Sequence, residues 1–158
     1  YEQLAQRLRQ DARVQVIERT NIRTIDANLF HLPIAIAVID VSFISLQKVL
    51  PAVMKLVEPT GDVIGLIKPQ FEVGPGHVSK RGVVRDARIH VQVLRAFIEF
   101  AQGTDFAVMD ICHSPIRGSA GNIEYLVWIK RDARTSPSDW DERVAQVVQG
   151  AHKELVNP

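Results

Sequence analysis

Residues 34–46, with the sequence IAIAVIDVSFISL, lead from a strand-like segment into the start of a helix. Ile34 to Val41 is almost entirely apolar and rich in β-branched side chains, which is typical of a parallel strand buried on both faces. Ser45 is a good residue to cap the helix that follows. The apolar positions of that helix recur at helical spacing, at Leu46, Val49, Leu50, Val53 and Leu56.

The remaining chain continues this alternation of strands and helices. Further strands are predicted at 13–19, 63–67, 106–111 and 123–129. Helices are predicted at 2–10, after the cap Asp86, and after a capping box formed by Ser136, Pro137 and Asp139. The pattern favours an α/β fold with a largely parallel sheet, in which the short connection before the last strand indicates an antiparallel edge.

Composition excludes several classes of protein. The chain has 158 residues, 46% of them hydrophobic, and a formal net charge of +1, which argues against disorder and against a uniform polycation. The single cysteine, Cys112, allows no disulfide framework within the chain and fits a reducing cytoplasm. No apolar run is long enough to span a membrane. Because the chain begins at Tyr1 and its first glycine is Gly61, we expect a piece of a longer protein.

Three polar residues stand near the ends of predicted strands. Asp40 and Lys68 follow the strands 34–39 and 63–67, and Glu124 lies at the start of the last strand. If that strand is antiparallel, its start lies at the same sheet edge as the ends of the others. Ligands of open α/β sheets bind at this edge. We therefore expect Asp40, Lys68 and Glu124 to converge there, although each one alone is equally well explained as a solvated residue at a strand end.

Five blocks of the sequence resemble the TlyA family, whose members are FtsJ-type ribosomal RNA 2′-O-methyltransferases often described as haemolysins. The blocks are LAQRLR (4–9), VIERTN (16–21), DVSFISL (40–46), KPQFEVG (68–74) and GNIEY (121–125). The resemblance spans nearly the whole chain. It implies a Rossmann-type fold that binds S-adenosylmethionine (SAM), with Asp40, Lys68 and Glu124 as catalytic residues.

Other parts of the family pattern have no counterpart in this sequence. These are the first lysine of the catalytic set, the glycine-rich SAM loop, the acidic residue that holds the SAM ribose, and a small S4 RNA-binding domain, all of which lie upstream in the family. We therefore expect residues 1–158 to be a partial FtsJ-like methyltransferase domain that lacks the first strand and the glycine-rich loop.

The resemblance also suggests residues that hold the cofactor. Glu18, Thr20 and Asn21 are expected near the adenosine of SAM, although a plain polar turn explains them equally well. Asp40 is expected near its methionine portion, and Val41 and Ser42 are expected to be further cofactor-binding residues. The five histidines lack metal-ligand spacing, so no metal is expected.

Basic residues are expected to meet RNA on the loops at 74–85 and 114–122. Lys80, Arg81, Arg85 and Arg117 could contact phosphates of ribosomal RNA or of ribosomal subunits. A solvated, charged loop is the competing interpretation of the same four residues.

Three functions compete at this stage. The first is SAM-dependent 2′-O-methylation of ribosomal RNA in the cytoplasm by the parent protein, with the isolated fragment inactive. The second is a non-catalytic module that binds RNA or a partner through the same fold. The third, a membrane-active haemolysin, is opposed by the composition. A fragment of this kind would expose a sheet edge through which two copies could pair as a homodimer.

Overall fold

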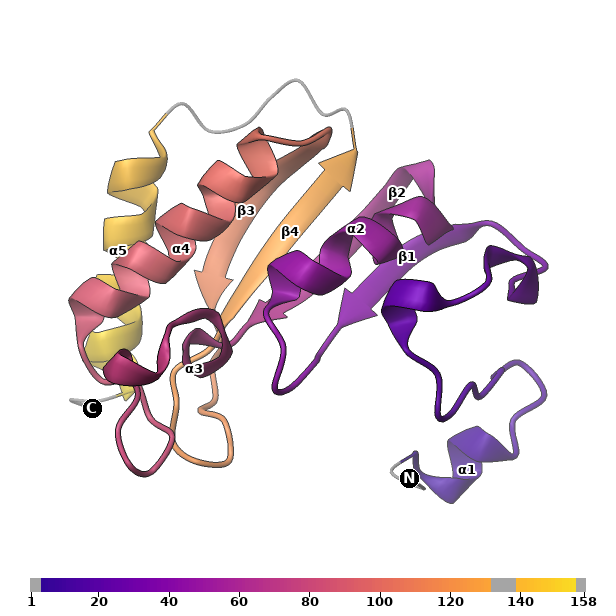
Figure 1. Cartoon of the computed structure of the whole chain (residues 1–158), viewed down its shortest axis with the longest axis horizontal. Coiled ribbons are helices and arrows are strands. Elements are labelled where there is room, and N and C mark those ends of the chain that lie inside the picture. Colours follow the sequence, from indigo (N-terminus) through magenta and orange to yellow (C-terminus); the bar gives the residue numbers. More distant parts are fainter. Residues whose placement is uncertain (1–3, 132–138, 156–158) are drawn as a thin grey trace.

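The computed structural model describes residues 4–131 and 139–155, which form a four-stranded sheet covered by helices (Figure 1). The strand order is β1-β2-β4-β3, and β4 is antiparallel to both of its neighbours whereas β1 and β2 are parallel. The strands are β1 (Ile34–Ile39), β2 (Val57–Ile67), β3 (Phe106–His113) and β4 (Tyr125–Arg131). The predicted α/β fold with a reversed last strand is confirmed.

Three long helices lie on this sheet. Figure 1 shows α2 and α4 side by side over the sheet, and α5 packs against α4 and β3. Their bounds are α2 (Leu46–Leu56), α4 (Ala87–Gln102) and α5 (Trp140–Leu155). Shorter helical turns are α1 (Gln6–Arg9), η1 (Ile22–Thr24), η2 (Ala27–Leu29), α3 (Pro69–Glu72) and η3 (Pro75–His77).

The helix caps follow the sequence closely. The side chain of Ser45 accepts a hydrogen bond from the Gln47 amide at the start of α2, as predicted. Asp86 caps α4 in the same way. At α5 the cap is Asp139, whose carboxylate accepts from the Glu142 amide at 3.1 Å. The other two predicted members of that capping box, Ser136 and Pro137, lie outside the described residues.

The core lies between the helices and one face of the sheet. Val63, Ile67, Tyr125, Val127 and Ile129 are fully buried on that face. The register pairs Val63 with Ile129 and Ile67 with Tyr125, so these side chains form continuous rows across β2 and β4. The apolar stripes of α2 and α4 cover them.

The other face of the sheet exposes several apolar side chains. Ile36, Val38 and Trp128 are 64%, 76% and 40% exposed. The prediction that 34–41 is buried on both faces is therefore wrong. β1 is an edge strand, and only the side chains that alternate toward α2 find a packing partner among the described residues. The exposed edge that was predicted is present, and pairing of two copies through it stays a prediction.

Two elements predicted near the N-terminus differ from the structure. Residues 13–19 form no strand, because no neighbouring backbone in the described part of the chain completes a ladder with them. The helix predicted at 2–10 is reduced to α1, which buries none of its residues. A helix this short gains little stability without packing. Residues 2 and 3 of that prediction lie outside the described residues.

The boundaries of three strands also differ. β2 begins at Val57, directly after α2, rather than at residue 63. β3 continues to His113 rather than ending at 111, and β4 spans 125–131 rather than 123–129. The strand types are as expected, and only their ends shift, because hydrogen bonding to neighbouring strands rather than local composition sets where a ladder stops.

A buried histidine joins the helices to the sheet. His90 on α4 is fully buried, with Nε2 3.0 Å from the Val84 carbonyl oxygen and Nδ1 2.7 Å from the Tyr125 hydroxyl. A carbonyl can only accept, so Nε2 carries a hydrogen. Burial lowers the pKa of His90, while the Val84 hydrogen bond partly opposes this. Burial therefore favours the neutral ring, in which the Tyr125 hydroxyl donates to Nδ1.

We expect the free energy of unfolding to fall as pH decreases from about 7.5 to about 5.5. Folding lowers the pKa of the His90 ring below its unfolded value of about 6.5. The unfolded chain therefore binds more protons than the folded chain in this pH window. One such group contributes at most about 1.4 kcal/mol per pH unit. Urea unfolding at a series of pH values measures the slope, and His90→Gln should flatten it.

The exposed His31 supplies the control for this experiment. His31→Gln should keep the wild-type slope. His152 packs 5.0 Å from His90, and burial lowers the pKa of His152 as well, so some slope should persist in His90→Gln. Equal slopes in wild type and in His90→Gln would contradict a neutral His90 in the folded protein.

Candidate active site

The carboxyl ends of β1 and β2 bring two of the predicted residues together. Asp40 directly follows β1 and Lys68 directly follows β2, and these two strands are parallel neighbours. Lys68 Nζ lies 2.6 Å from Asp40 Oδ1 and donates a hydrogen bond to Ser42 Oγ at 3.2 Å. The Lys68 side chain is 12% exposed, whereas that of Asp40 is 68% exposed, so the pair opens to solvent on the Asp40 side.

The reversed direction of β4 adds the third residue. Ile67 pairs with Tyr125, so Glu124 and Lys68, which adjoin this pair, reach the same sheet edge. Burial raises the pKa of the Glu124 carboxyl and the nearby Asp40 raises it further, while the charge of Lys68 and a hydrogen bond from Gln70 lower it. The structure thus brings Asp40, Lys68 and Glu124 together as expected.

Glycine at position 118 leaves the space that Glu124 occupies. A Cβ atom on Gly118 would lie 2.5 Å from Glu124 Oε1 and 3.0 Å from its Cδ. Glu124 is only 9% exposed, so its carboxyl has little freedom to move aside. The close approach of this backbone therefore fixes where the carboxyl group points.

Gln70 offers an open acceptor near the same carboxyl. Its Oε1 is buried and has no hydrogen-bond partner among the described residues. A buried, unpaired acceptor is unfavourable in the free protein.

Glu72 ties the two strand-end segments to each other. Its Oε2 accepts a hydrogen bond from Ser45 Oγ at 2.6 Å, and its Oε1 accepts from the Leu46 amide at 2.7 Å. Both donors stand at the N-terminus of α2, where a carboxylate is also favoured by the helix dipole. The residues that follow Lys68 thereby hold in place the residues that follow Asp40.

Phe43 is an exposed aromatic residue beside this cluster. It is 91% exposed and has a φ of +62°, a left-handed backbone conformation that is uncommon for a bulky residue. Its ring centroid lies 5.1 Å from that of Phe71. Phe43 was not among the expected site residues, and its signal in the sequence was an aromatic side chain in the turn between Asp40 and Ser45.

The predicted cofactor residues upstream of β1 are engaged locally. Glu18 forms an ion pair with Arg9, and Thr20 Oγ1 donates to the Glu18 carbonyl at 3.0 Å. Asn21 caps η1 by accepting from the Arg23 amide at 3.1 Å. These contacts are those of a polar turn, and the structure does not place Glu18, Thr20 or Asn21 against Asp40.

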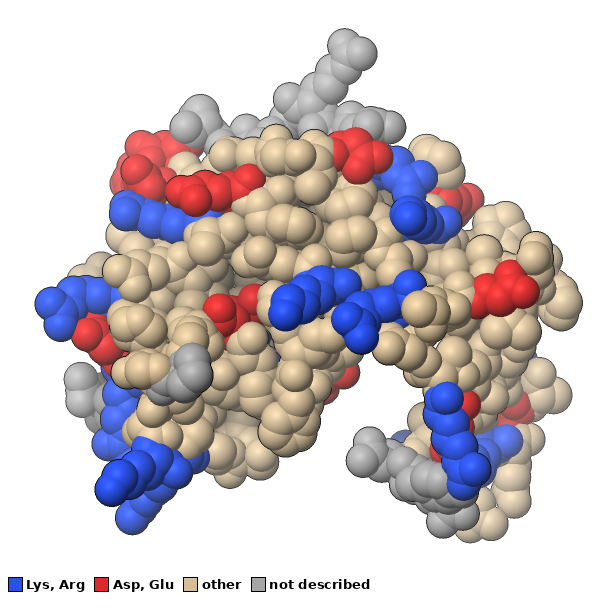
Figure 2. Space-filling model, viewed as in Figure 1, with Lys and Arg blue, Asp and Glu red and all other residues tan. Residues whose placement is uncertain are grey.

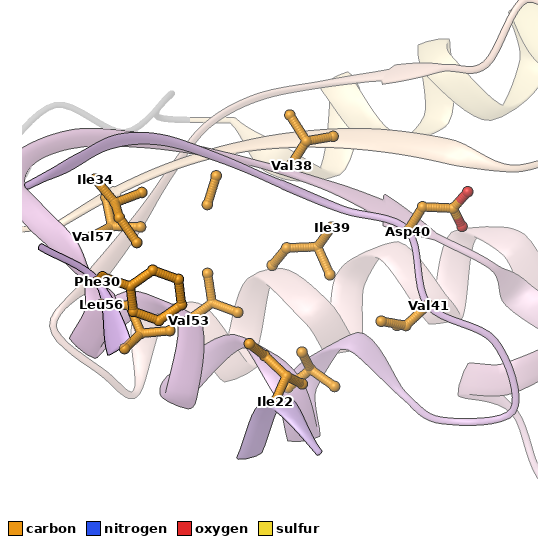
Figure 3. Close-up of a pocket in the computed structure, with 12 residues that line it drawn as sticks. Ile22, Phe30, Ile34, Val38, Ile39, Asp40, Val41, Val53, Leu56 and Val57 are labelled. Atoms are coloured by element: carbon orange, nitrogen blue, oxygen red, sulfur yellow. The ribbon is translucent and has the colours of Figure 1, made fainter. Parts of the chain in front are cut away.

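A cavity of about 300 Å³ lies between η1, β1 and α2 (Figure 3). Figure 3 shows Phe30 and Ile34 at one end and Asp40 and Val41 at the other. Its walls are aliphatic and aromatic, and Asp40 is its one charged lining residue. Of the predicted cofactor residues, Asp40 and Val41 line the cavity. Ser42 does not line it, and its hydroxyl oxygen accepts a hydrogen bond from Lys68.

The four predicted RNA-contacting residues are exposed on two loops. Lys80, Arg81 and Arg85 lie between η3 and α4, and Arg117 lies between β3 and β4. None of the four has a side-chain ion pair with another described residue. In Figure 2, Lys and Arg side chains project at the lower left, where Figure 1 shows these loops. Arg85 and Arg117 line a common cavity that does not include Lys80 or Arg81.

Metal-ion sites and membrane-spanning helices are both absent from the described residues. Within residues 4–131 and 139–155, no three His, Cys, Asp or Glu side chains are grouped so that they could hold a metal ion. No helix in the same ranges is both long and apolar enough to cross a membrane.

Comparison with known proteins places this site in a family. Residues 1–131 match the model of the FtsJ-like methyltransferases. The chain belongs to the FtsJ-like methyltransferase family. It is 41% identical over 161 residues to "Putative rRNA methyltransferase YqxC" of Bacillus subtilis, covering 98% of this chain and 56% of that protein.

Two further relatives agree with this. The chain is 40% identical over 130 residues to the 16S/23S rRNA (cytidine-2′-O)-methyltransferase TlyA of Mycobacterium tuberculosis, covering 82% of this chain and 48% of that protein. A solved structure named "Putative hemolysin from Streptococcus thermophilus" superimposes with a TM-score of 0.88 at 39% identity, over 98% of this chain and 56% of that one. The chain spans about half the length of the curated relatives it matches. The resemblance to TlyA is confirmed.

Replacing Glu72 should loosen α2 in this FtsJ-like chain. We expect Glu72→Ala to lower the free energy of unfolding by about 1–3 kcal/mol, because the Ser45 hydroxyl and the Leu46 amide lose their acceptor. Glu72→Gln keeps one acceptor oxygen and should lose less. Urea unfolding measures both, and a Glu72→Ala variant as stable as wild type would show that α2 does not depend on this cap.

Proposed function

We propose that this FtsJ-like chain is the catalytic part of a SAM-dependent methyltransferase that modifies the ribose 2′-hydroxyl of ribosomal RNA. The observation that carries the proposal is the position of Lys68 Nζ, 2.6 Å from Asp40 and beside the buried Glu124. The family and the named activity of the TlyA relative support the reaction class and the substrate. Ribosomal subunits are the expected partner, and the cytoplasm is the expected compartment.

Lys68 is proposed to act on the hydroxyl that is methylated. A ribose hydroxyl is a weak nucleophile until its proton is withdrawn or the developing negative charge on oxygen is stabilised. Lys68 Nζ is held by Asp40 and Ser42, and either role requires such a fixed nitrogen. Asp40 and Glu124 orient Lys68 and set the charge around it.

SAM is the cofactor that we propose for this site. When bound, it supplies a methyl group on a sulfonium, which is already activated for transfer. The residues present fit it in part. The aliphatic walls of the cavity beside β1 suit the faces of an adenine ring, and Asp40 adds a carboxylate at its rim. The proposed cofactor residues remain Glu18, Thr20, Asn21, Asp40, Val41 and Ser42.

RNA is proposed to approach along the exposed side of the cluster. Lys80, Arg81, Arg85 and Arg117 would neutralise backbone phosphates. Phe43 presents an aromatic face next to Asp40, and such faces stack on nucleic-acid bases. A base held by Phe43 would bring its own ribose close to Lys68.

A second candidate function is a non-catalytic module that binds RNA or a partner. It is favoured by the local engagement of Glu18, Thr20 and Asn21, which leaves the cofactor side of the fold with few open polar groups.

No glycine precedes Gly61 in the sequence. We propose accordingly that residues 1–158 alone do not transfer methyl groups and that activity belongs to the full-length natural polypeptide.

Methyl transfer from labelled SAM to isolated ribosomal subunits tests the enzyme. In the full-length natural polypeptide, Lys68→Met should lower incorporation by about two to four orders of magnitude, the range expected when a group that handles a proton is lost. Lys130→Met is the matched control, because Lys130 pairs with Asp62 toward the opposite end of β4. It should transfer methyl groups like wild type.

The two candidate functions give different results in this assay. Label at 2′-oxygens with wild type and with Lys130→Met, but not with Lys68→Met, supports the enzyme. Undiminished incorporation by Lys68→Met would remove Lys68 from the chemistry. A full-length protein that binds RNA but neither binds SAM nor transfers its methyl group would leave the non-catalytic module.

Replacing Phe43 tests the proposed stacking. Loss of one base–aromatic stack corresponds to about 1–3 kcal/mol. Phe43→Ala should therefore weaken RNA binding by about 5-fold to 150-fold, while Phe43→Tyr keeps the ring and should bind like wild type. Fluorescence anisotropy with labelled RNA measures the affinity of both variants. Equal affinities of the wild type and Phe43→Ala would exclude stacking on Phe43.

A further inference from the structure

Two loops beside the candidate active site are locked together by a buried asparagine. Asn122 is 2% exposed, and its Oδ1 accepts a hydrogen bond from the Val84 amide at 3.0 Å. Its Nδ2 donates to the Gly82 carbonyl at 2.9 Å. The loop before α4 and the loop before β4 are therefore fixed relative to each other before any ligand binds.

The junction of these loops encloses a cavity of about 300 Å³ with basic walls. Arg85 comes from the first loop, Arg117 from the second, and His152 from α5. The remaining lining residues are Val83, Val84, Ala120, Gly121 and Ile123, so no acidic side chain lines it. Arg85 and Arg117 are exposed and make no side-chain ion pair with a described residue.

His152, which lines the cavity, has a ring nitrogen without a hydrogen-bond partner among the described residues. This nitrogen, Nε2, is buried. Burial lowers the pKa of His152, which favours a neutral ring that can still donate one N–H. The carboxylate of Asp86 opposes this lowering, and its oxygens are already bound by the Arg88 side chain and amide at the start of α4.

We propose that this cavity binds a phosphate group of the RNA backbone, with Arg85 and Arg117 as its charged ligands and the His152 ring as a neutral donor. Guanidinium groups match phosphate oxygens in charge and in the geometry of their N–H donors. The assignment to RNA rests on the function proposed above. It separates Arg85 and Arg117, which share a built cavity, from Lys80 and Arg81, which stand on the loop surface.

The cavity is linked to the candidate active site through two neighbouring residue pairs. Arg117 adjoins Gly118, where a Cβ atom would collide with the Glu124 carboxyl, and Ile123 of the cavity directly precedes Glu124. A phosphate held here would fix the backbone of an RNA strand whose ribose lies at Lys68. The cavity therefore acts as a positioning site for the substrate and does not take part in the chemistry.

The first experiment uses inorganic phosphate and the full-length natural polypeptide. Phosphate should shift the ring resonances of His152 in a saturable titration followed by nuclear magnetic resonance, with chloride at equal ionic strength as the reference. Arg85→Gln/Arg117→Gln should abolish the saturation. Absence of a saturable shift in the wild-type protein would overturn the phosphate site.

The second experiment asks whether the phosphate belongs to RNA. Binding of a fluorescein-labelled single-stranded RNA is measured at several salt concentrations. Each phosphate contact contributes about 0.7 to the slope of log affinity against log salt, and the two arginines share one phosphate, so Arg85→Gln/Arg117→Gln should lower the magnitude of the slope by about 0.7. The matched control, Lys55→Gln/Lys130→Gln, removes two charges toward the opposite sheet edge and should keep the wild-type slope.

The remaining outcomes separate this proposal from the proposed enzyme. A wild-type slope in Arg85→Gln/Arg117→Gln would overturn the RNA assignment. So would arginine-dependent binding to vesicles of phosphatidylglycerol and phosphatidylcholine without binding to RNA, since the phosphate would then be a lipid headgroup. Methyl transfer is not a readout here, so an inactive protein that still binds phosphate and RNA through Arg85 and Arg117 refutes only the enzyme.

Discussion

The reversed direction of β4 is the constraint on which the rest of this structure depends. β4 lies between β2 and β3 and is antiparallel to both, so its beginning meets the ends of its neighbours. A parallel strand in that place would carry Glu124 to the far edge of the sheet, away from Lys68. The same reversal brings the loop before β4 against the loop before α4, where Asn122 joins them. The convergence of Asp40, Lys68 and Glu124 and the position of the basic cavity therefore both follow from the direction of β4.

A single carboxylate, that of Glu72, accepts the hydrogen bonds that hold the residues after Asp40 in place. Glu72 binds the N-terminus of α2 through Ser45 and Leu46, and α2 packs on β2 through its apolar stripe. The turn between Asp40 and Ser45 is thus held at both of its ends, by β1 and by α2. A turn held in this way can keep Phe43 in a left-handed conformation that costs of order 1–3 kcal/mol. The exposure of Phe43 is then a property of the scaffold rather than of a loose loop.

The sequence was sufficient to predict the convergence of Asp40, Lys68 and Glu124, because strand ends in an α/β sheet meet at one edge and a short connection indicates a reversed strand. It was insufficient for the environment of β1. An apolar run such as 34–41 looks the same whether a partner covers its second face or not, so the exposure of Ile36 and Val38 had no local signature. The role of Glu72 was hidden for a different reason, since its partners are more than twenty residues away. The strand expected at 13–19 failed because strand formation depends on a neighbouring backbone as well as on composition.

The unequal exposure of Lys68 and Asp40 indicates what their ion pair is for. A pair with one partner 68% exposed is worth little to stability, about 0–1 kcal/mol, because water competes for the carboxylate. Lys68 is different, since its side chain is 12% exposed and a charged nitrogen in that position needs a compensating partner. Asp40 and Ser42 supply that compensation from one side, and Glu124 supplies negative charge from a buried position on another. The arrangement keeps a nitrogen at a fixed point while leaving the side toward Asp40 open, which is what the role proposed for Lys68 requires.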